Sequence, residues 1–163
     1  MCDVVLTTLR DEFTDLGDAA QFTRVALRLV LAVALAGAIG FERELRGRTA
    51  GLRTHMMLAL GVALAVVIAE QAGIDLSRVM QGVLAGIGFL GAGAIIKRRE
   101  EEEVTGLTTA ASIWATAAIA LAAGLGREAT AVLATGIALV ILAVLRHADE
   151  RIAEIGAGRD KDD

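Results

Sequence analysis

Five long apolar runs, separated by short polar segments, fill the chain from about residue 25 to residue 145. A helix rises about 1.5 Å per residue, so a hydrocarbon core of about 30 Å needs about 20 residues. Four runs approach this length unaided, and the second reaches it with a few flanking residues. The pattern predicts an all-α integral membrane protein, a bundle of about five transmembrane helices. The expected spans are residues 25–41, 52–72, 79–96, 104–126 and 129–145.

The segments that flank this transmembrane domain, residues 1–24 and 146–163, are polar. The first lacks the basic start and apolar middle of a cleavable signal peptide. Its apolar residues recur at helical spacing, which is compatible with a short amphipathic helix on the membrane surface or with a frayed end. We expect an N-terminal arm on the outer side, the domain 25–145, and a tail.

Basic residues are distributed unequally between the two sides of the predicted bundle. Of the 16 Lys and Arg residues, those between runs one and two, between runs three and four, and after run five share one side. The other side holds only Arg10, Arg24, Arg28, Arg78 and Arg127; apart from Arg28, the runs contain no Asp, Glu, Lys or Arg. Because cytoplasmic segments carry the excess of basic residues, we expect a periplasmic N-terminus and a cytoplasmic C-terminus in a bacterial inner membrane.

Composition agrees with a membrane protein and offers little catalytic chemistry. The chain is 55% hydrophobic, with mean hydropathy +0.61 and no proline, which exceeds what a soluble core needs. Its one cysteine, Cys2, allows neither an internal disulfide nor a zinc spacing. With no paired base and nucleophile and no cluster of metal ligands, we expect no enzyme activity, cofactor, bound metal or nucleic-acid partner.

The third run is crowded with glycine, and three of its glycines spell G-x-G-x-x-G. A dinucleotide site needs a strand, a glycine turn that opens a helix, and an acidic residue about 20 positions later. Here the glycines lie inside one uninterrupted apolar run, so we interpret them as small residues that let helix backbones approach closely. The predicted glycine packing motif is Gly82, Gly86, Gly88, Gly91 and Gly93.

The segment between the first two runs is the most polar stretch next to the membrane. It is either a solvated turn with positive-inside arginines or a folded polar cap, partly out of water, in which a carboxylate needs a partner and a histidine responds to pH. The candidate functional cluster is Glu42, Arg43, Glu44, Arg53, Thr54 and His55.

Hydroxyl side chains mark the fourth run at steps of three and four, which predicts one stripe along a helix. Such hydroxyls either bond across helices and to their own carbonyls or line a narrow polar path. The stripe is Thr105, Thr108, Thr109, Ser112 and Thr116.

A short internal repeat relates the first two runs to the next two. Ile39-Gly40-Phe41 returns as Ile87-Gly88-Phe89, and Gly51-Leu52-x-Thr54 returns as Gly106-Leu107-x-Thr109. The repeat suggests two parallel hairpins related about the membrane normal, with the fifth helix added.

Four sequence blocks together resemble the MgtC/SapB family. They are Glu42-Arg43-Glu44, the segment 50–55, the glycine run 86–93 and the segment 106–114, in the family's order. The resemblance implies a bacterial inner-membrane protein connected with magnesium limitation, survival inside host cells and, for some members, restraint of the ATP synthase. Two features depart from it: only residues 146–163 stand where longer members carry a soluble domain, and Glu100–Glu103 form an acidic run.

Two classes of function remain. One is a membrane protein that regulates other complexes in adaptation to Mg²⁺ limitation or to acid or host stress; the other is a transporter of Mg²⁺ or another cation. Ion pathways usually place ionisable residues within the spans, and their scarcity here favours regulation. The expected partners are the lipid bilayer, other inner-membrane proteins such as the ATP synthase or a cation transporter, and further copies of the chain.

Overall fold

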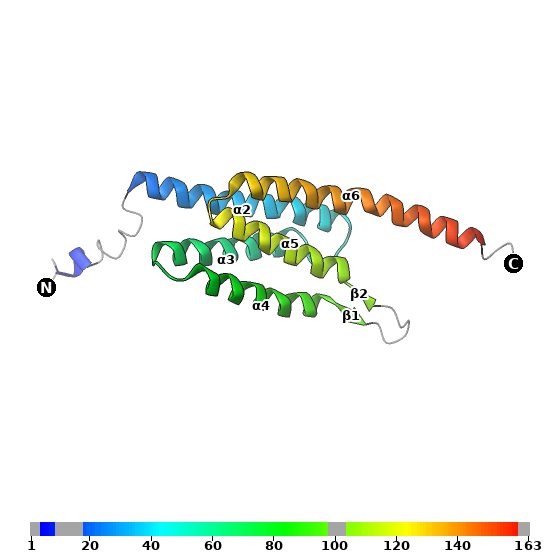
Figure 1. The fold of residues 1–163 in the computed structure, drawn as a ribbon, viewed down its shortest axis with the longest axis horizontal. Helices are drawn as coiled ribbons and strands as arrows, with labels where there is room; N and C mark the ends of the chain where they lie inside the picture. The colour runs from blue at the N-terminus through cyan, green and yellow to red at the C-terminus, as the bar shows by residue number, and fades with distance from the viewer. Residues whose placement is uncertain (1–3, 9–17, 98–103, 160–163) are drawn as a thin grey trace.

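The chain forms an elongated bundle of five helices in a computed structural model that describes residues 4–8, 18–97 and 104–159 (Figure 1). Residues 4–8 form a helical turn ahead of the bundle. Two short strands pair between the third and fourth helices of the bundle. The elements are α2 (Ala19–Leu45), α3 (Leu52–Gln71), α4 (Leu76–Ala94), β1 (Ile96–Lys97), β2 (Val104–Thr105), α5 (Leu107–Gly124) and α6 (Glu128–Arg159).

Helix α5 lies at the centre and contacts α2, α3, α4 and α6. The core around it consists mainly of alanine, with a few isoleucine and valine residues; among them are Ala36, Ala63, Val66, Ala117 and Ala120. Lipid tails are as apolar as these side chains, so helix association in a membrane depends on close packing, which small residues permit. The composition of the runs therefore explains why α2, α3 and α5 meet with almost no intervening side chain.

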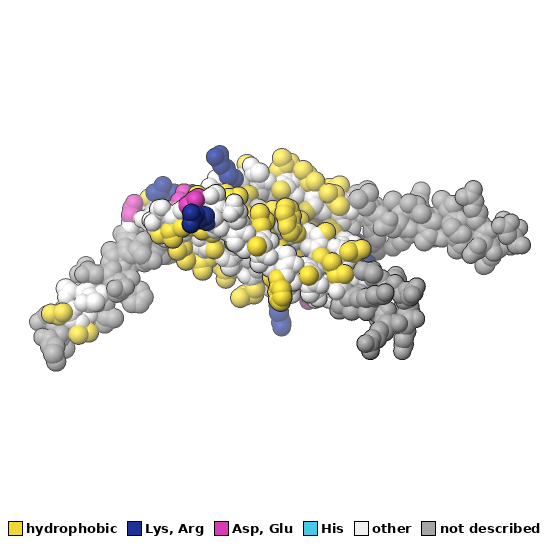
Figure 2. Space-filling model, turned by 60° about the horizontal axis from the view of Figure 1, so that its bottom comes forward, with side chains coloured by type: hydrophobic (Ala, Val, Ile, Leu, Met, Phe, Trp, Pro, Cys, Tyr) yellow, Lys and Arg dark blue, Asp and Glu magenta, His cyan; other side chains and the backbone are white. Residues whose placement is uncertain are grey.

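Four helices, α2 to α5, are long and apolar enough to cross a membrane. In α6 the described apolar part, Glu128–Ala143, is shorter. Large apolar side chains such as those of Phe89, Leu133 and Val140 are exposed on the bundle, and Figure 2 shows one face covered largely by such groups. These observations confirm an all-α membrane bundle, while the crossing by the fifth run remains a prediction.

The helices extend beyond the apolar runs from which they were predicted. Helix α2 continues to Leu45, so Glu42 and Arg43 lie on a helix and not in a turn. Helix α6 continues to Arg159 and includes most of the predicted tail. The fourth span was expected to begin at Val104, but Val104 and Thr105 pair with Lys97 and Ile96 as strands, and α5 begins at Leu107. The acidic run Glu100–Glu103 lies outside the described residues.

Polar groups close the helix ends. The Asp75 side chain accepts hydrogen bonds from the hydroxyl and the backbone N–H of Ser77, at 2.7 and 2.9 Å, which lowers the pKa of this carboxyl. Helix α3 has Gly51 as its N-cap, and a Glu44 carboxylate oxygen accepts from the Leu52 N–H at 2.8 Å. Glu44, predicted in the functional cluster, is exposed, and its role in this structure is to cap a helix.

The two copies of the internal repeat occupy equivalent places but pack differently. Gly51 and Gly106 are the N-caps of α3 and α5. A Cβ added at Gly40 would lie 2.8 Å from the Leu52 Cα, whereas a Cβ at its counterpart Gly88 would meet nothing within 4 Å. The first hairpin is thus closed through its glycine and the second is not.

Gly40→Ala should lower the free energy of unfolding by about 1–3 kcal/mol, because the added methyl group meets backbone that cannot move aside. Gly88→Ala, in the same repeat position, should be neutral or gain about 0.5–1 kcal/mol from the helix preference of alanine. The measurement is reversible unfolding of the purified protein in detergent. Equal effects at the two glycines would contradict the close α2–α3 contact.

Candidate functional site: a buried polar cluster

An arginine is buried between helices at the end of the bundle where α2 stops. Arg43 belongs to the last turn of α2 and is 4% exposed. Its Nη2 donates a hydrogen bond of 2.7 Å to the Thr109 hydroxyl in the first turn of α5. A cation near a helix C-terminus is favoured by the partial negative charge there. The guanidinium therefore joins α2 to α5.

A histidine is fully buried beside this arginine. His55, in the first turn of α3, is 0% exposed, and its Nδ1 lies 2.9 Å from the Thr116 hydroxyl. That hydroxyl already donates its one proton to the Ser112 carbonyl at 2.9 Å. It therefore accepts from His55, which assigns the proton of the neutral ring to Nδ1 and leaves Nε2 as an acceptor.

Three of the five predicted stripe residues lie on the buried face of α5: Thr109, Ser112 and Thr116. Ser112 donates to the Thr109 carbonyl at 2.8 Å, the local bonding common for hydroxyls in helices. The stripe was wrong at its other two positions. Thr108 is exposed, because it is rotated about 100° from Thr109, and Thr105 lies in β2 before the helix begins.

Three buried polar atoms in this region have no hydrogen-bond partner among the described residues: Glu42 Oε2, Arg43 Nε and His55 Nε2. The other oxygen of Glu42 accepts from Arg46 Nε at 3.0 Å. A buried polar group without a partner costs about 1–3 kcal/mol, and an ionisable group inside a membrane protein is a functional candidate by default. We call Glu42, Arg43, His55, Thr109 and Thr116 the polar cluster.

The predicted functional cluster is only partly assembled. Arg43 and His55 are buried and Glu42 is partly buried, whereas Arg53 and Thr54 are exposed. The hydroxyls of Thr109 and Thr116 were predicted as a separate stripe, although they are the partners of Arg43 and His55. A usable signal existed, because Ala32, Ala36, Ile39, Gly40 and Arg43 are the buried residues of α2 and follow one helical spacing.

The predicted glycine motif does not pack within the chain. Only Gly91 has a neighbour within 4 Å of an added Cβ, the Ala110 methyl group at 3.8 Å. Ile87 is the one buried residue of α4, and Phe89 is 82% exposed. Within the chain, the expectation of close packing at the other four glycines, Gly82, Gly86, Gly88 and Gly93, is wrong because α4 lies at the edge of the bundle.

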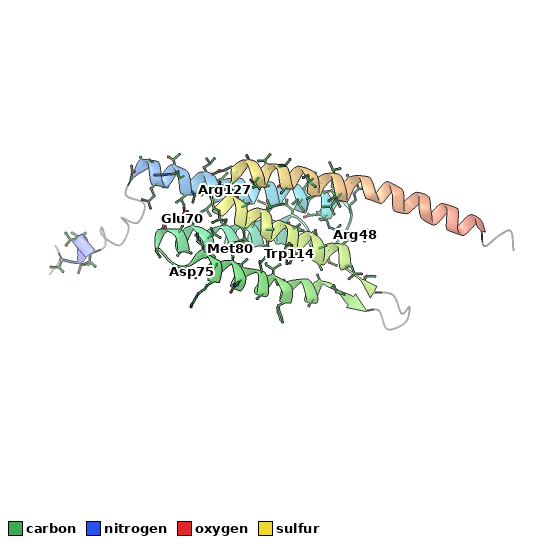
Figure 3. The ribbon with its side chains drawn as sticks, in the orientation of Figure 1. Arg48, Glu70, Asp75, Met80, Trp114 and Arg127 are labelled. Carbon is green, nitrogen blue, oxygen red and sulfur yellow. The ribbon has the colours of Figure 1, made fainter. Side chains whose placement is uncertain are left out.

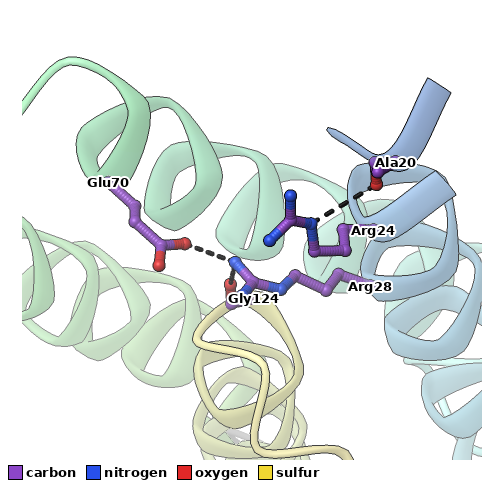
Figure 4. A network of polar contacts seen from close by, with 5 residues as sticks. All are labelled: Ala20, Arg24, Arg28, Glu70 and Gly124. Carbon is purple, nitrogen blue, oxygen red and sulfur yellow. Dashed lines mark hydrogen bonds and ion pairs between the residues drawn. The ribbon is translucent and has the colours of Figure 1, made fainter. Parts of the chain in front are cut away.

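A second polar contact lies at the opposite end of the bundle (Figure 4). Arg28 forms an ion pair with Glu70 in the last turn of α3 and donates from Nη1 to the Gly124 carbonyl at 3.1 Å. Figure 3 shows Glu70, Asp75 and Arg127 at this end and Arg48 at the other. From the sequence, Arg28 was counted only among the basic residues of the outer side, and this contact was missed.

No three His, Cys, Asp or Glu side chains come together as metal ligands within residues 4–8, 18–97 and 104–159. The two polar sites are instead separated by packed apolar residues. Beyond Thr116, α5 buries Ala117, Ile119, Ala120 and Leu121 before it reaches the Arg28 end.

The chain matches a family of known proteins over most of its length. The MgtC family profile matches residues 29–151. The chain belongs to the MgtC family. The matched range includes the polar cluster and both predicted hairpins, so the site lies within the part that the family shares.

Curated MgtC-family relatives are 38–41% identical to the chain. YhiD of Escherichia coli (strain K12) is 38% identical over 77% of this chain and 62% of its own length. SrpB of Synechococcus elongatus is 41% identical over 79% of this chain and 78% of its own. MgtC of Salmonella typhimurium is 41% identical over 79% of this chain and 55% of its own. The chain thus spans less than two thirds of the length of YhiD and MgtC. No solved structure matches the chain.

Thr109→Val should destabilise the protein by about 1–3 kcal/mol, because the substitution keeps the shape of the side chain but removes the acceptor of a buried guanidinium. The neighbouring exposed Thr108→Val is the matched control and should stay within about 0.5 kcal/mol of the parent. Unfolding in detergent measures both variants. Equal stability would show that Arg43 does not depend on the Thr109 hydroxyl.

Proposed function

We propose that this MgtC-family protein acts in the bacterial inner membrane in adaptation to Mg²⁺ limitation or to acid or host stress. We further propose that it regulates other membrane complexes, such as the ATP synthase, and does not itself carry the ion. Family membership supports the connection with magnesium, since one relative, YhiD, is named provisionally for magnesium transport. The regulatory role is supported by the geometry of the polar cluster.

The observation that carries this proposal is a polar site closed on one side by apolar packing. Between Thr116 and the Gly124 carbonyl, α5 runs eight residues, or about 12 Å of helix. Its buried side chains there, with Ala63 and Val66 of α3, belong to the apolar core. A cation needs oxygen ligands or water along its whole path. Within the described part of the chain, α5 offers polar side chains from Thr109 to Thr116 and none among its buried residues from Ala117 to Ala123, and the buried Thr135 hydroxyl of α6 is bonded to the Ala131 carbonyl.

The polar cluster can respond to its surroundings without conducting an ion. An imidazole can gain a proton, and His55 is buried in the same polar cluster as Arg43. Protonation at Nε2 would place a second buried cation near the guanidinium, which favours a rearrangement of α2, α3 and α5. A partner that contacts this end of the bundle would sense that rearrangement.

Substitution of the cluster by apolar residues of similar volume separates function from folding. Arg43→Met and His55→Leu each remove a nitrogen that is buried without a partner among the described residues, so both variants should still insert, and their accumulation in the membrane is measured alongside. Neither should restore growth of a null strain in low Mg²⁺ or at mildly acidic pH. Arg48→Met, at an exposed arginine of the same end, is the control and should complement fully.

Flux measurements decide between regulation and transport. Liposomes that contain only this protein and an entrapped Mg²⁺ indicator should show no uptake above protein-free liposomes. Saturable Mg²⁺ uptake that is lost in a Ser112→Ala variant would replace regulation by transport. Full complementation by Arg43→Met would instead show that neither regulation nor transport depends on the polar cluster.

The orientation of the bundle can be tested at two glycine turns of positive φ, Gly47 and Gly73, which precede α3 and α4. A reporter that is active only in the cytoplasm should work when fused after Gly47 and stay silent after Gly73, because the basic residues concentrate on the Gly47 side. The opposite pattern would show that the bundle has the inverse orientation. Activity at both sites would show that α3 does not cross the membrane.

A further inference from the structure

A cleft of about 210 Å³ opens between α2 and α3 at the Arg28 end of the bundle. Each of the two helices contributes polar side chains and one valine to the lining of this cleft. The residues that matter are Gln21, Arg24, Val25 and Arg28 of α2, with Val67 and Glu70 of α3.

The cleft carries a formal charge of +1 from two guanidiniums and one carboxylate. Arg28 is held by its ion pair with Glu70 and its hydrogen bond to the Gly124 carbonyl. Arg24, one helical turn earlier, contacts the Ala20 carbonyl through Nε at 3.3 Å (Figure 4). Its two Nη groups make no hydrogen bond to a described residue. Like charges four residues apart on a helix repel each other, so an anion between them would be stabilised.

We propose that this cleft binds the phosphodiester of an anionic phospholipid, with Arg24 as the main contact and Arg28 as the supporting charge. A guanidinium donates two parallel hydrogen bonds to phosphate oxygens, which an ammonium group does not match. The cleft lies at the end of helices that are long and apolar enough to cross a membrane, which is where lipid phosphates lie. Leu27, exposed on α2 on the membrane side of Arg24, offers apolar surface to acyl chains.

Thermal unfolding of the full chain in detergent tests the site, because a ligand that binds only the folded state raises the midpoint. The probes are phosphatidylglycerol, phosphatidylcholine and inorganic phosphate. Phosphatidylglycerol should raise the midpoint of the parent protein more than the other two. In Arg24→Gln its apparent dissociation constant should rise about tenfold or more, the loss expected for a hydrogen bond between charged groups.

The matched controls are Arg78→Gln and Arg127→Gln. Both arginines are exposed and neither lines the cleft. Arg127 lies at the same end as the cleft in Figure 3, and so does Asp75, with which Arg78 forms an ion pair. Both variants should keep the response to phosphatidylglycerol. Because Arg24 is exposed, its glutamine variant should fold, and an unchanged midpoint without lipid verifies this. Arg24→Lys, which keeps the charge but loses the fork, should bind with intermediate affinity.

Several outcomes would overturn the proposal. An equal response to phosphatidylglycerol in Arg24→Gln and the parent would exclude the cleft as the site. Equal losses in all three glutamine variants would indicate general attraction to charge. A response that depends on Arg24 and is produced by inorganic phosphate but not by the lipid would assign the cleft to free phosphate. An equal response to phosphatidylcholine would remove the preference for anionic lipid.

Discussion

Two glycine contacts fix helix α3 against its neighbours, and both polar sites depend on them. Near the start of α3, Gly40 of α2 brings the two backbones so close that an added Cβ would lie 3.0 Å from the His55 Cβ. Near its other end, Gly124 of α5 lies where an added Cβ would meet Val66 and Ala63 at 3.0 and 3.1 Å. In a lipid environment such contacts supply much of the attraction between helices, since there is little hydrophobic gain from association. Without them, Arg43 and Arg28 could not reach across to α5.

Each polar site stands directly beside one of these contacts. Gly40 is three residues from Arg43 and adjoins His55, and the Gly124 carbonyl itself accepts a hydrogen bond from Arg28. Close backbones exclude lipid from the polar groups and leave short side-chain paths between helices. Buried charges must be shielded from lipid, and only small residues let the helices approach closely enough to shield them. Small residues and buried charges therefore occur together. The buried apolar residues of α5 from Ala117 to Ala123 then separate the two sites.

Much of the fold follows from sequence because helical periodicity and apolar length are local properties. The runs predicted the helices, and the repeat placed Gly51 and Gly106 at equivalent helix starts. The apolar run ended at Phe41, however, while the helix ended at Leu45. For the charged residues after this run, the sequence is compatible with both a solvated turn and a folded polar cap. Helical spacing from Ala32 through Ile39 to Arg43 carries the correct information, since a buried face continues past the point where hydrophobicity stops.

Contacts between residues far apart in the sequence could not be predicted from helical periodicity and apolar length. The Arg28–Glu70 pair and the Arg43–Thr109 contact depend on which helices become neighbours and how each is rotated. The glycine-rich α4 shows the same limit, because close packing requires a partner as well as a small residue. The repeat gives Gly40 and Gly88 the same local sequence, yet α3 closes on Gly40 while Gly88 stays open. Helix α4 packs against α5 and α3, but a Cβ added at Gly82, Gly86, Gly88 or Gly93 would meet nothing within 4 Å, so close packing at these glycines requires a helix from outside the described chain.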